Sequence, residues 1–170
     1  MRPGGNGHAI FLNGIPSAGK SSVAAKIRSR TSTFRVLTGD DVIRQVPFQQ
    51  RAGQADKLFV MVLTSIERWL GSSNVIVDGA WTERKVSEAR ERFGHMGLYV
   101  VLRIDESERK RREALRKDRQ LGHRWKPAWH DMPGPDDIYD VVIDSKATNV
   151  SKCATTILTA AGEHWNDLLL

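Results

Sequence analysis

The sequence predicts an α/β fold in three layers, with a central parallel sheet of about five strands between helices. Short apolar runs with the character of buried strands alternate with segments that repeat apolar residues at helical spacing. This alternation is typical of parallel strands joined by helices. The first apolar run also leads into a glycine-rich loop followed by a helix. A chain of 170 residues suits one such unit, so we expect residues 1–170 to form a single domain.

The expected strands are short and strongly apolar, as buried parallel strands are. In chain order they are Ala9–Leu12, Phe34–Leu37, Val75–Asp78, Leu98–Leu102 and Ile138–Asp144.

The expected helices follow from apolar periodicity and from residues that begin or end helices. Pro47, Gly71, Gly94 and Gly122 are the expected helix ends, and Asp105 with Glu108 resembles a capping box. The helices are expected from Lys20 through Ile27, over Val42–Val46 and Lys57–Leu70, from Thr82 to Phe93, from Asp105 to Leu121 and over Val150–Ala161.

The glycine-rich loop is the feature around which the other elements are arranged. Residues 14–21 read Gly-Ile-Pro-Ser-Ala-Gly-Lys-Ser, which matches the pattern G-x-x-x-x-G-K-S. Glycines at these positions allow positive φ, so that backbone amides approach phosphate oxygens closely. The following helix directs its positive dipole end at the same oxygens. The sequence therefore predicts a phosphate-binding loop and a P-loop kinase-like fold.

The residues of this loop are expected to bind a nucleoside triphosphate and its magnesium ion. Lys20 would contact the β and γ phosphates as a point charge, and the Ser21 hydroxyl would bind Mg²⁺. The predicted cofactor-binding residues are Gly14, Ile15, Pro16, Ser17, Ala18, Gly19, Lys20, Ser21 and Ser22, together with Arg112 from a basic segment.

Carboxylates follow two of the expected strands. Asp40 and Asp41 come after Phe34–Leu37, and we interpret Asp41 as a general base for an attacking hydroxyl with Asp40 in support. Helix capping is the alternative role for this pair. Asp78 ends its strand and is expected to bind magnesium, directly or through water, unless it only caps the next turn.

Positive charge is concentrated in one segment. The net charge is +6, and Arg103–Lys126 holds ten Lys or Arg residues against five Asp or Glu residues. Arg112, Arg116 and Arg119 are spaced to share one helix face, where their guanidinium groups would stabilise charge on a transferred phosphoryl group. We predict Arg116 and Arg119 as catalytic, with Lys20 and Asp41, in a basic helical lid over residues 105–137. A solvated, ion-paired face is the alternative.

Several classes of function are disfavoured. Hydrophobic residues make up 40% of the chain, without an apolar run as long as a membrane span or a signal peptide at the start, and we expect a cytoplasmic protein. A single cysteine, Cys153, excludes an internal disulfide and a cysteine-based metal cluster. A nucleic-acid partner is disfavoured because no aromatic RNA-binding pattern accompanies the charge. The residues after Asp78 lack the D-x-x-G of a GTPase switch.

These motifs together resemble the chloramphenicol phosphotransferase-like family of small P-loop kinases. The resemblance is carried by Leu12–Ser21, by Gly39-Asp40-Asp41 with Pro47, by Val75–Asp78 and by the spacing from Arg103 to Gly122. It covers most of the chain. It implies that ATP is the phosphoryl donor, that Asp41 is the catalytic base, and that chloramphenicol or another hydroxylated antibiotic is the acceptor.

The identity of the acceptor stays open, because the stretch between Pro47 and Val75 is shorter than in the antibiotic kinase. We expect an ATP-dependent phosphotransferase acting on a small-molecule hydroxyl. A kinase of a metabolite or a nucleic-acid end, and a regulator that binds nucleotide without chemistry, are the alternatives. Trp81, Trp125 and Trp129 either wall the acceptor site or pack in the core. The apolar end Leu168–Leu170, with Trp165, leaves room for a homo-oligomer.

Overall fold

The structure is a computed structural model that describes residues 7–116 and 132–166. Its centre is a five-stranded sheet with the strand order β2-β3-β1-β4-β5. Every neighbouring pair is parallel, which confirms the predicted parallel sheet. The strands are β1 (Ala9–Asn13), β2 (Phe34–Thr38), β3 (Asn74–Asp78), β4 (Gly97–Arg103) and β5 (Val141–Asp144).

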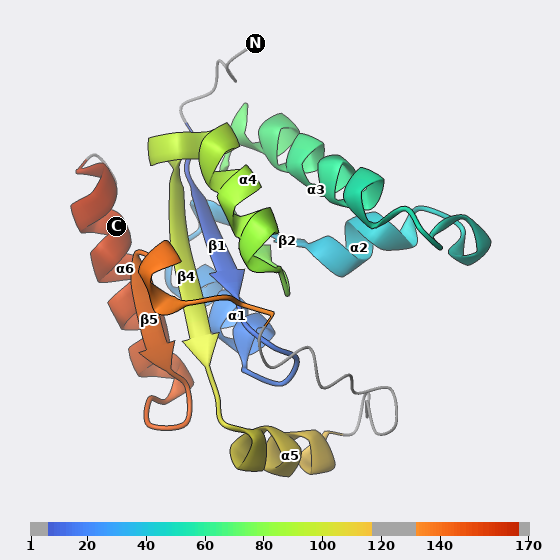
Figure 1. Ribbon diagram of the computed structural model, residues 1–170. Coiled ribbons are helices and arrows are strands. Elements are labelled where there is room, and N and C mark those ends of the chain that lie inside the picture. Colours follow the sequence, from blue (N-terminus) through green and yellow to red (C-terminus); the bar gives the residue numbers. More distant parts are fainter. Residues whose placement is uncertain (1–6, 117–131, 167–170) are drawn as a thin grey trace.

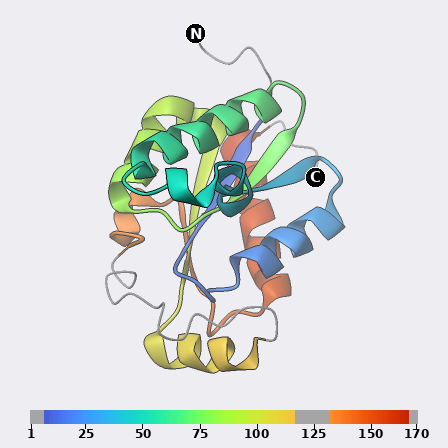
Figure 2. The same ribbon diagram turned by 90° about the vertical axis from the view of Figure 1, so that its right-hand side faces the viewer.

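Helices cover both faces of this sheet, so the structure has three layers (Figures 1 and 2). Side chains of α1 and α6 pack on one face, and side chains of α3 and α4 pack on the other. The helices are α1 (Lys20–Arg30), α2 (Gly39–Arg44), α3 (Ala55–Leu70), α4 (Glu83–Phe93), α5 (Glu106–Leu115) and α6 (Val150–Trp165). Short 3₁₀ turns are formed by Phe48–Gln50, Gly94–Met96 and Asp136–Ile138.

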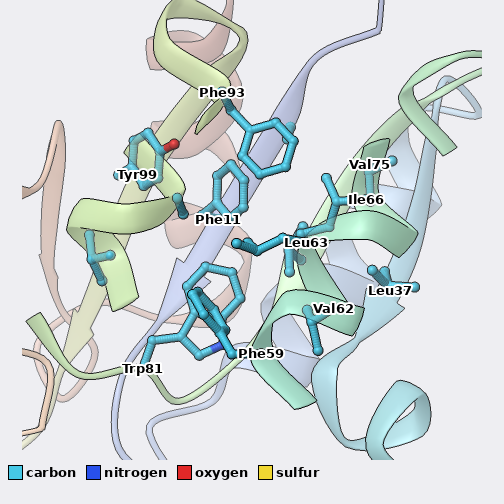
Figure 3. Close-up of a cluster of buried hydrophobic side chains, with 14 of the residues drawn as sticks. Phe11, Leu37, Phe59, Val62, Leu63, Ile66, Val75, Trp81, Phe93 and Tyr99 are labelled. Atoms are coloured by element: carbon cyan, nitrogen blue, oxygen red, sulfur yellow. The ribbon is translucent and has the colours of Figure 1, made fainter. Parts of the chain in front are cut away.

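An aromatic cluster fills the layer between the sheet and α3 and α4 (Figure 3). The Phe11 ring of β1 stacks on Tyr99 of β4 with ring centroids 4.7 Å apart, and it also contacts Phe93 and Trp81 at 5.4 Å. Trp81 is 6% exposed and meets the ring of Phe59. Trp81 is therefore a core residue, as the packing interpretation predicts, whereas Trp125 and Trp129 lie outside the described residues.

The other apolar layer includes Cys153 and Trp165 of α6. Cys153 is 1% exposed, and burial raises the pKa of its thiol. Trp165 is stacked on His8 at 4.5 Å and donates a hydrogen bond to the carbonyl of His95. Trp165 is thus covered within the chain, whereas Leu168–Leu170 lie outside the described residues.

The strand register brings the ends of several strands to one level. Leu12 and Thr38 are both register partners of Asp78, and Arg103 is the partner of Asp144. The loops that follow the strands therefore meet at one edge of the sheet, where ligands bind in open α/β folds. Helix α5 lies beyond this edge, away from the two helical layers (Figure 1).

Helices α1, α3 and α6 are two to four residues longer than predicted, ending at Arg30, starting at Ala55 and ending at Trp165 respectively, and two helices near the cavity differ in ways that affect the site. Helix α2 starts at Gly39 rather than Val42, because Asp40 and Asp41 favour the positive end of a helix and join its first turn. Helix α5 ends at Leu115 rather than Leu121, and Arg116 has an extended backbone. Leu115 is 68% exposed, so apolar burial does not hold the last turn of α5.

The part of the chain that the structure describes contains no helix with both the length and the apolar character that crossing a bilayer requires.

Replacing Phe11 with alanine should lower the free energy of unfolding by about 3–5 kcal/mol, because the change leaves a cavity among packed aromatic rings. Phe48→Ala is the matched control, since Phe48 is 79% exposed, and it should change stability by about 0.5 kcal/mol or less. Urea unfolding measures both values. Equal losses in the two variants would contradict the packing described for Phe11.

Candidate active site

The loop over residues 14–21 has the backbone conformation that its glycines predict. Gly14 has φ 147° and Gly19 has φ 98°, and Ser17 also lies at positive φ, 67°. A Cβ atom on Gly14 would approach the carbonyl oxygen of Leu102 to 2.7 Å. A glycine is therefore required at position 14 for two reasons: its φ is positive, and a side chain there would collide with the backbone of β4. Gly19 directly precedes the first turn of α1, so the N-terminus of that helix opens at the loop.

The side chains of the loop divide between the core and a cavity. Ile15 and Ala18 are 4% and 0% exposed and pack in the layer beneath the loop. Lys20 Nζ donates hydrogen bonds to the carbonyl oxygens of Gly14 (2.8 Å) and Ile15 (3.1 Å). The predicted loop residues that line the cavity are Pro16, Ser17, Gly19, Lys20, Ser21 and Ser22.

This cavity lies at the carboxyl edge of the sheet and has a volume of about 1010 Å³, which suits a nucleotide together with a small acceptor. Besides the loop, the cavity is lined by residues that end or follow β2 and β3, namely Thr38, Asp40, Arg44, Asp78, Gly79 and Ala80, and by Arg112, Arg116, Met132 and Val150.

Ser21 and Asp78 lie together, as the sequence predicts. The Ser21 hydroxyl donates a hydrogen bond of 2.6 Å to Asp78 Oδ2, and Asp78 is only 6% exposed. Both groups supply oxygen atoms, which are the ligands that Mg²⁺ prefers. No cluster of three or more His, Cys, Asp or Glu side chains suited to a metal occurs among the described residues. The pair fits a magnesium ion that takes its remaining ligands from phosphates and water.

The two adjacent acids on α2 occupy different surroundings. Asp40 lines the cavity, whereas Asp41 is not among its lining residues and lies 3.4 Å from Arg44 on the exposed side of the helix. Successive side chains on an α-helix point about 100° apart, since 3.6 residues make a turn. The two carboxylates of α2 therefore point in different directions. Asp40 lines the same cavity as Lys20, and the predicted base Asp41 is not among the lining residues.

Helix α5 is attached to the loop by two polar contacts. Ser17 Oγ donates a hydrogen bond of 2.6 Å to Glu113, and Arg112 donates to the carbonyl oxygen of Ala18 at 3.2 Å. Arg112 also donates to the carbonyl and hydroxyl oxygens of Ser145, which follows β5. Arg112 therefore connects α5, the phosphate loop and the end of the sheet.

Ion pairs and a cap stabilise α5 itself. Asp105 accepts a hydrogen bond from the Glu108 amide, which is one half of the predicted capping box, whereas the Glu108 carboxylate accepts from Arg111 and Arg112. The bond from the Glu108 amide and the contact with Lys146 hold the pKa of Asp105 well below its usual range. The guanidinium groups of Arg111 and Arg112 lower the pKa of Glu108 to about 2. The contribution of Glu108 to stability is present above pH about 4.5 and is lost as the pH falls towards 2.

The predicted face of three arginines is only partly described. Glu108 pairs with Arg112 at 2.8 Å, as the ion-paired alternative predicts, although Arg112 also lines the cavity. Arg116 lines the cavity from the residue after α5, so it does not share a helix face with Arg112. Arg119 lies outside the described residues, as does the part of the predicted lid from 117 to 131.

Asn13 is a site residue to which the sequence analysis assigned no role. It is 2% exposed, and its side chain uses its full hydrogen-bonding capacity. Its Oδ1 accepts from the amides of Gly14 (2.9 Å) and Trp81 (2.7 Å). Its Nδ2 donates to the Trp81 carbonyl (2.9 Å) and to the Tyr139 hydroxyl (2.5 Å). The signal for Asn13 that the sequence offered was a polar residue at the end of a fully apolar strand.

The contacts of Asn13 extend to the segment that returns towards β5. The Tyr139 hydroxyl donates to the carbonyl oxygen of Pro133. Arg103, at the end of β4, donates to the Gly134 carbonyl at 2.6 Å and to Asp136 at 2.8 Å. The described C-terminal end of the predicted lid is therefore joined to the end of β4 and, through Tyr139 and Asn13, to the start of the phosphate loop.

A family comparison agrees with the motifs. Residues 7–162 match the family model described as chloramphenicol phosphotransferase-like protein. No curated protein matches the sequence of this chain.

Solved structures share the fold at low sequence identity. A gluconokinase from Sinorhizobium meliloti 1021 has 19% identity and a TM-score of 0.71, covering 98% of this chain and 97% of that one. The APS kinase of Mycobacterium tuberculosis, solved with AMPPNP and APS, has 14% identity and a TM-score of 0.69, covering 92% and 98%. The tunicamycin resistance protein of Deinococcus radiodurans has 13% identity and a TM-score of 0.67, covering 92% and 96%. These similarities confirm the P-loop kinase fold.

Replacing Tyr139 with phenylalanine should lower the free energy of unfolding by about 1–3 kcal/mol, because Asn13 Nδ2 and the Pro133 carbonyl each lose a buried partner. The matched control is Tyr99→Phe, since the buried Tyr99 hydroxyl has no hydrogen-bond partner among the described residues. Chemical unfolding of both variants compares the two hydroxyls. The account of the Asn13 network fails if Tyr99→Phe is the more damaging change.

Proposed function

Because the chain belongs to the chloramphenicol phosphotransferase-like family, we propose that it transfers the γ-phosphoryl group of ATP to a hydroxyl group of a small molecule. The observation that carries this proposal is the composition of one cavity. Lys20 and the phosphate loop line it, and so does Asp40. Phosphoryl transfer requires this combination of a bound donor, charge stabilisation and a group that accepts the proton of the attacking hydroxyl.

The donor half of the cavity is built to bind phosphates. Gly14 and Gly19 have the backbone dihedral angles of a loop whose amides face an anion, and α1 begins directly after Gly19. Lys20 would exchange its contacts with the loop carbonyls for the β and γ phosphates. Ser21 and Asp78 would hold Mg²⁺, which neutralises charge on the phosphates when bound.

We assign the role of general base to Asp40. In the proposed reaction the acceptor oxygen attacks the γ-phosphorus, the bond from that phosphorus to the bridging oxygen of ADP breaks, and the hydroxyl proton passes to the carboxylate. The base must lie beside the transferred group, and Asp40 lines the cavity that Lys20 also lines. Asp41 is not among the lining residues; it pairs with Arg44, which does line the cavity, and would support α2.

Arginine residues near the loop would stabilise the charge of the transferred group. Arg112 and Arg116 line the cavity beside Lys20, and guanidinium groups bind phosphoryl oxygens strongly. We propose that residues 105–137, including Arg119, act as a lid that closes over ATP and excludes water. Helix α5 would then move as the hydrogen bond between Ser17 and Glu113 breaks, because the phosphates and the Glu113 carboxylate repel each other.

The family name suggests chloramphenicol or another antibiotic as the acceptor. The similarity to a protein named for tunicamycin resistance is consistent with an antibiotic as the acceptor. The similarity to a gluconokinase is consistent with a metabolite as the acceptor. Incubation with γ-labelled ATP and hydroxylated antibiotics, sugars, nucleosides and oligonucleotides distinguishes these acceptors. Label in small molecules supports the proposal. Label in oligonucleotides alone, or tight ATP binding without transfer to any acceptor, overturns it.

The two acids of α2 can be separated by substitution. Asp40→Asn should lower kcat by about 10²–10⁴-fold, the usual contribution of a positioned general base, while the KM for ATP stays near its wild-type value. Asp41→Asn is the matched control, and its kcat should stay within about threefold of wild type because its carboxylate lies outside the cavity lining. Steady-state kinetics measures both. A large loss of kcat in Asp41→Asn with little change in Asp40→Asn would identify Asp41 as the general base.

A further inference from the structure

We infer that the acceptor carries an anionic group, a carboxylate or a phosphate or sulfate ester, and that Arg44 binds this group beside the reacting hydroxyl. The inference rests on the proposed function, because it concerns the acceptor half of the same cavity. It begins from one residue, Arg44, which lines the cavity although the sequence analysis gave it no role.

Arg44 and the proposed base lie on the same helix face. Asp40 and Arg44 both line the cavity, and they are four residues apart on α2. Residues at this spacing are neighbours on one side of a helix. An acceptor whose hydroxyl reaches Asp40 therefore presents its adjacent atoms to Arg44.

The positive charges of the cavity are divided between its halves. Lys20, Arg112 and Arg116 line it around the phosphate loop, where ATP would bind. In the half formed by Thr38, Asp40, Arg44, Gly79 and Ala80, Arg44 is the sole cation that the structure describes. The phosphates of the donor thus have their own cations, and Arg44 stands on the side from which the acceptor approaches.

The guanidinium group of Arg44 is weakly engaged by the protein. Its described ion pair is with Asp41 at 3.4 Å, and the side chains of both residues are 66% exposed. Exposed pairs of this kind contribute little to stability. An incoming carboxylate or phosphate can accept two parallel N–H bonds from the guanidinium fork, so an anionic ligand competes well with Asp41.

The backbone of Arg44 is held by a different arginine. Arg51 Nε donates to the Val46 carbonyl at 2.7 Å, and its NH2 group donates to the Arg44 carbonyl at 3.2 Å. Arg51 therefore fixes the C-terminal end of α2 against the following turn. The backbone of Arg44 is thus held by Arg51, and the described partner of its guanidinium group is the exposed carboxylate of Asp41, which an anionic ligand would displace.

The helix geometry also limits the acceptor. Asp40 and Arg44 are separated by about 6 Å along the helix axis, so one small molecule can contact both side chains. A hydroxyl and an anion a few bonds apart satisfy this spacing. The favoured acceptors are therefore small hydroxy acids and hydroxylated phosphate or sulfate esters rather than neutral alcohols.

The test offers the enzyme hydroxyl compounds in pairs that share a skeleton and differ in charge, such as gluconate with glucitol and adenosine 5′-monophosphate with adenosine. Wild-type kcat/KM should be about tenfold or more higher for the charged member, as expected for a hydrogen bond between charged groups. Arg44→Gln should remove this preference by raising the KM of the charged acceptor, with the KM for ATP unchanged.

Arg35→Gln is the matched control, because Arg35 is an exposed residue of β2 that lines no part of the cavity. Thermal unfolding of both variants checks that each is folded. The inference is overturned if the neutral members are preferred, or if Arg44→Gln and Arg35→Gln behave alike. It is also overturned if Arg44→Gln lowers kcat equally for both members, because Arg44 then acts on the transferred group.

These outcomes are distinct from a failure of the proposed function. Transfer of phosphate to neutral compounds alone would support the proposed phosphotransferase activity and would overturn the inference that the acceptor is anionic. Wild-type enzyme that binds ATP and transfers phosphate to no member of the panel overturns the proposed function, and the inference about Arg44 with it.

Discussion

The close approach of two backbone segments at the end of β1 determines where the phosphate loop lies. The Cα atom of Gly14 rests so near the Leu102 carbonyl that a Cβ atom there would lie only 2.7 Å from that oxygen. The preceding residue, Asn13, is held by four hydrogen bonds to Gly14, Trp81 and Tyr139. Strand β1 is central in the sheet, so the loop that follows it is fixed relative to every other strand end.

This position explains how residues far apart in the sequence come to share one cavity. Strand β3 lies beside β1 and delivers Asp78 to Ser21, and β2 lies next to β3 and delivers Asp40. Strand β4, on the other side of β1, leads to α5 and its arginines. The strand order therefore separates the arginines that follow β4 from an acceptor half formed by Asp40 and Arg44, which follow β2, with the phosphate loop and Asp78 between them. The proposed transfer would take place where the phosphate loop meets the acceptor half.

Most of the fold could be predicted from the sequence because local signals and tertiary structure agree. The alternation of apolar runs with helical periodicity predicted five parallel strands, and the pattern of residues 14–21 predicted positive φ at Gly14 and Gly19. The pairing of Ser21 with Asp78 followed from the rule that parallel strands end at one edge.

The remaining features depended on geometry that a sequence does not display. Helix α2 starts three residues earlier than predicted, so Asp40 and Asp41 both lie in its first turn, and of the two only Asp40 is among the described cavity-lining residues. The end of α5 at Leu115 separates Arg116 from the helix face of Arg112. The role of Asn13 depends on hydrogen-bond partners 68 and 126 residues away in the sequence. The proposed role of Arg44 depends on which side of the short helix α2 faces the cavity.

The central claim is that the phosphate loop holds a triphosphate and presents its last phosphate to the carboxylate of Asp40. A crystal structure of the protein with Mg²⁺ and a non-hydrolysable ATP analogue tests it most directly. We expect the triphosphate along residues 14–21, with Lys20 on the terminal phosphate, the metal at Ser21 and Asp78, and Asp40 facing the terminal phosphate across the acceptor half. A triphosphate bound elsewhere, or one whose terminal phosphate points away from Asp40, would contradict the account.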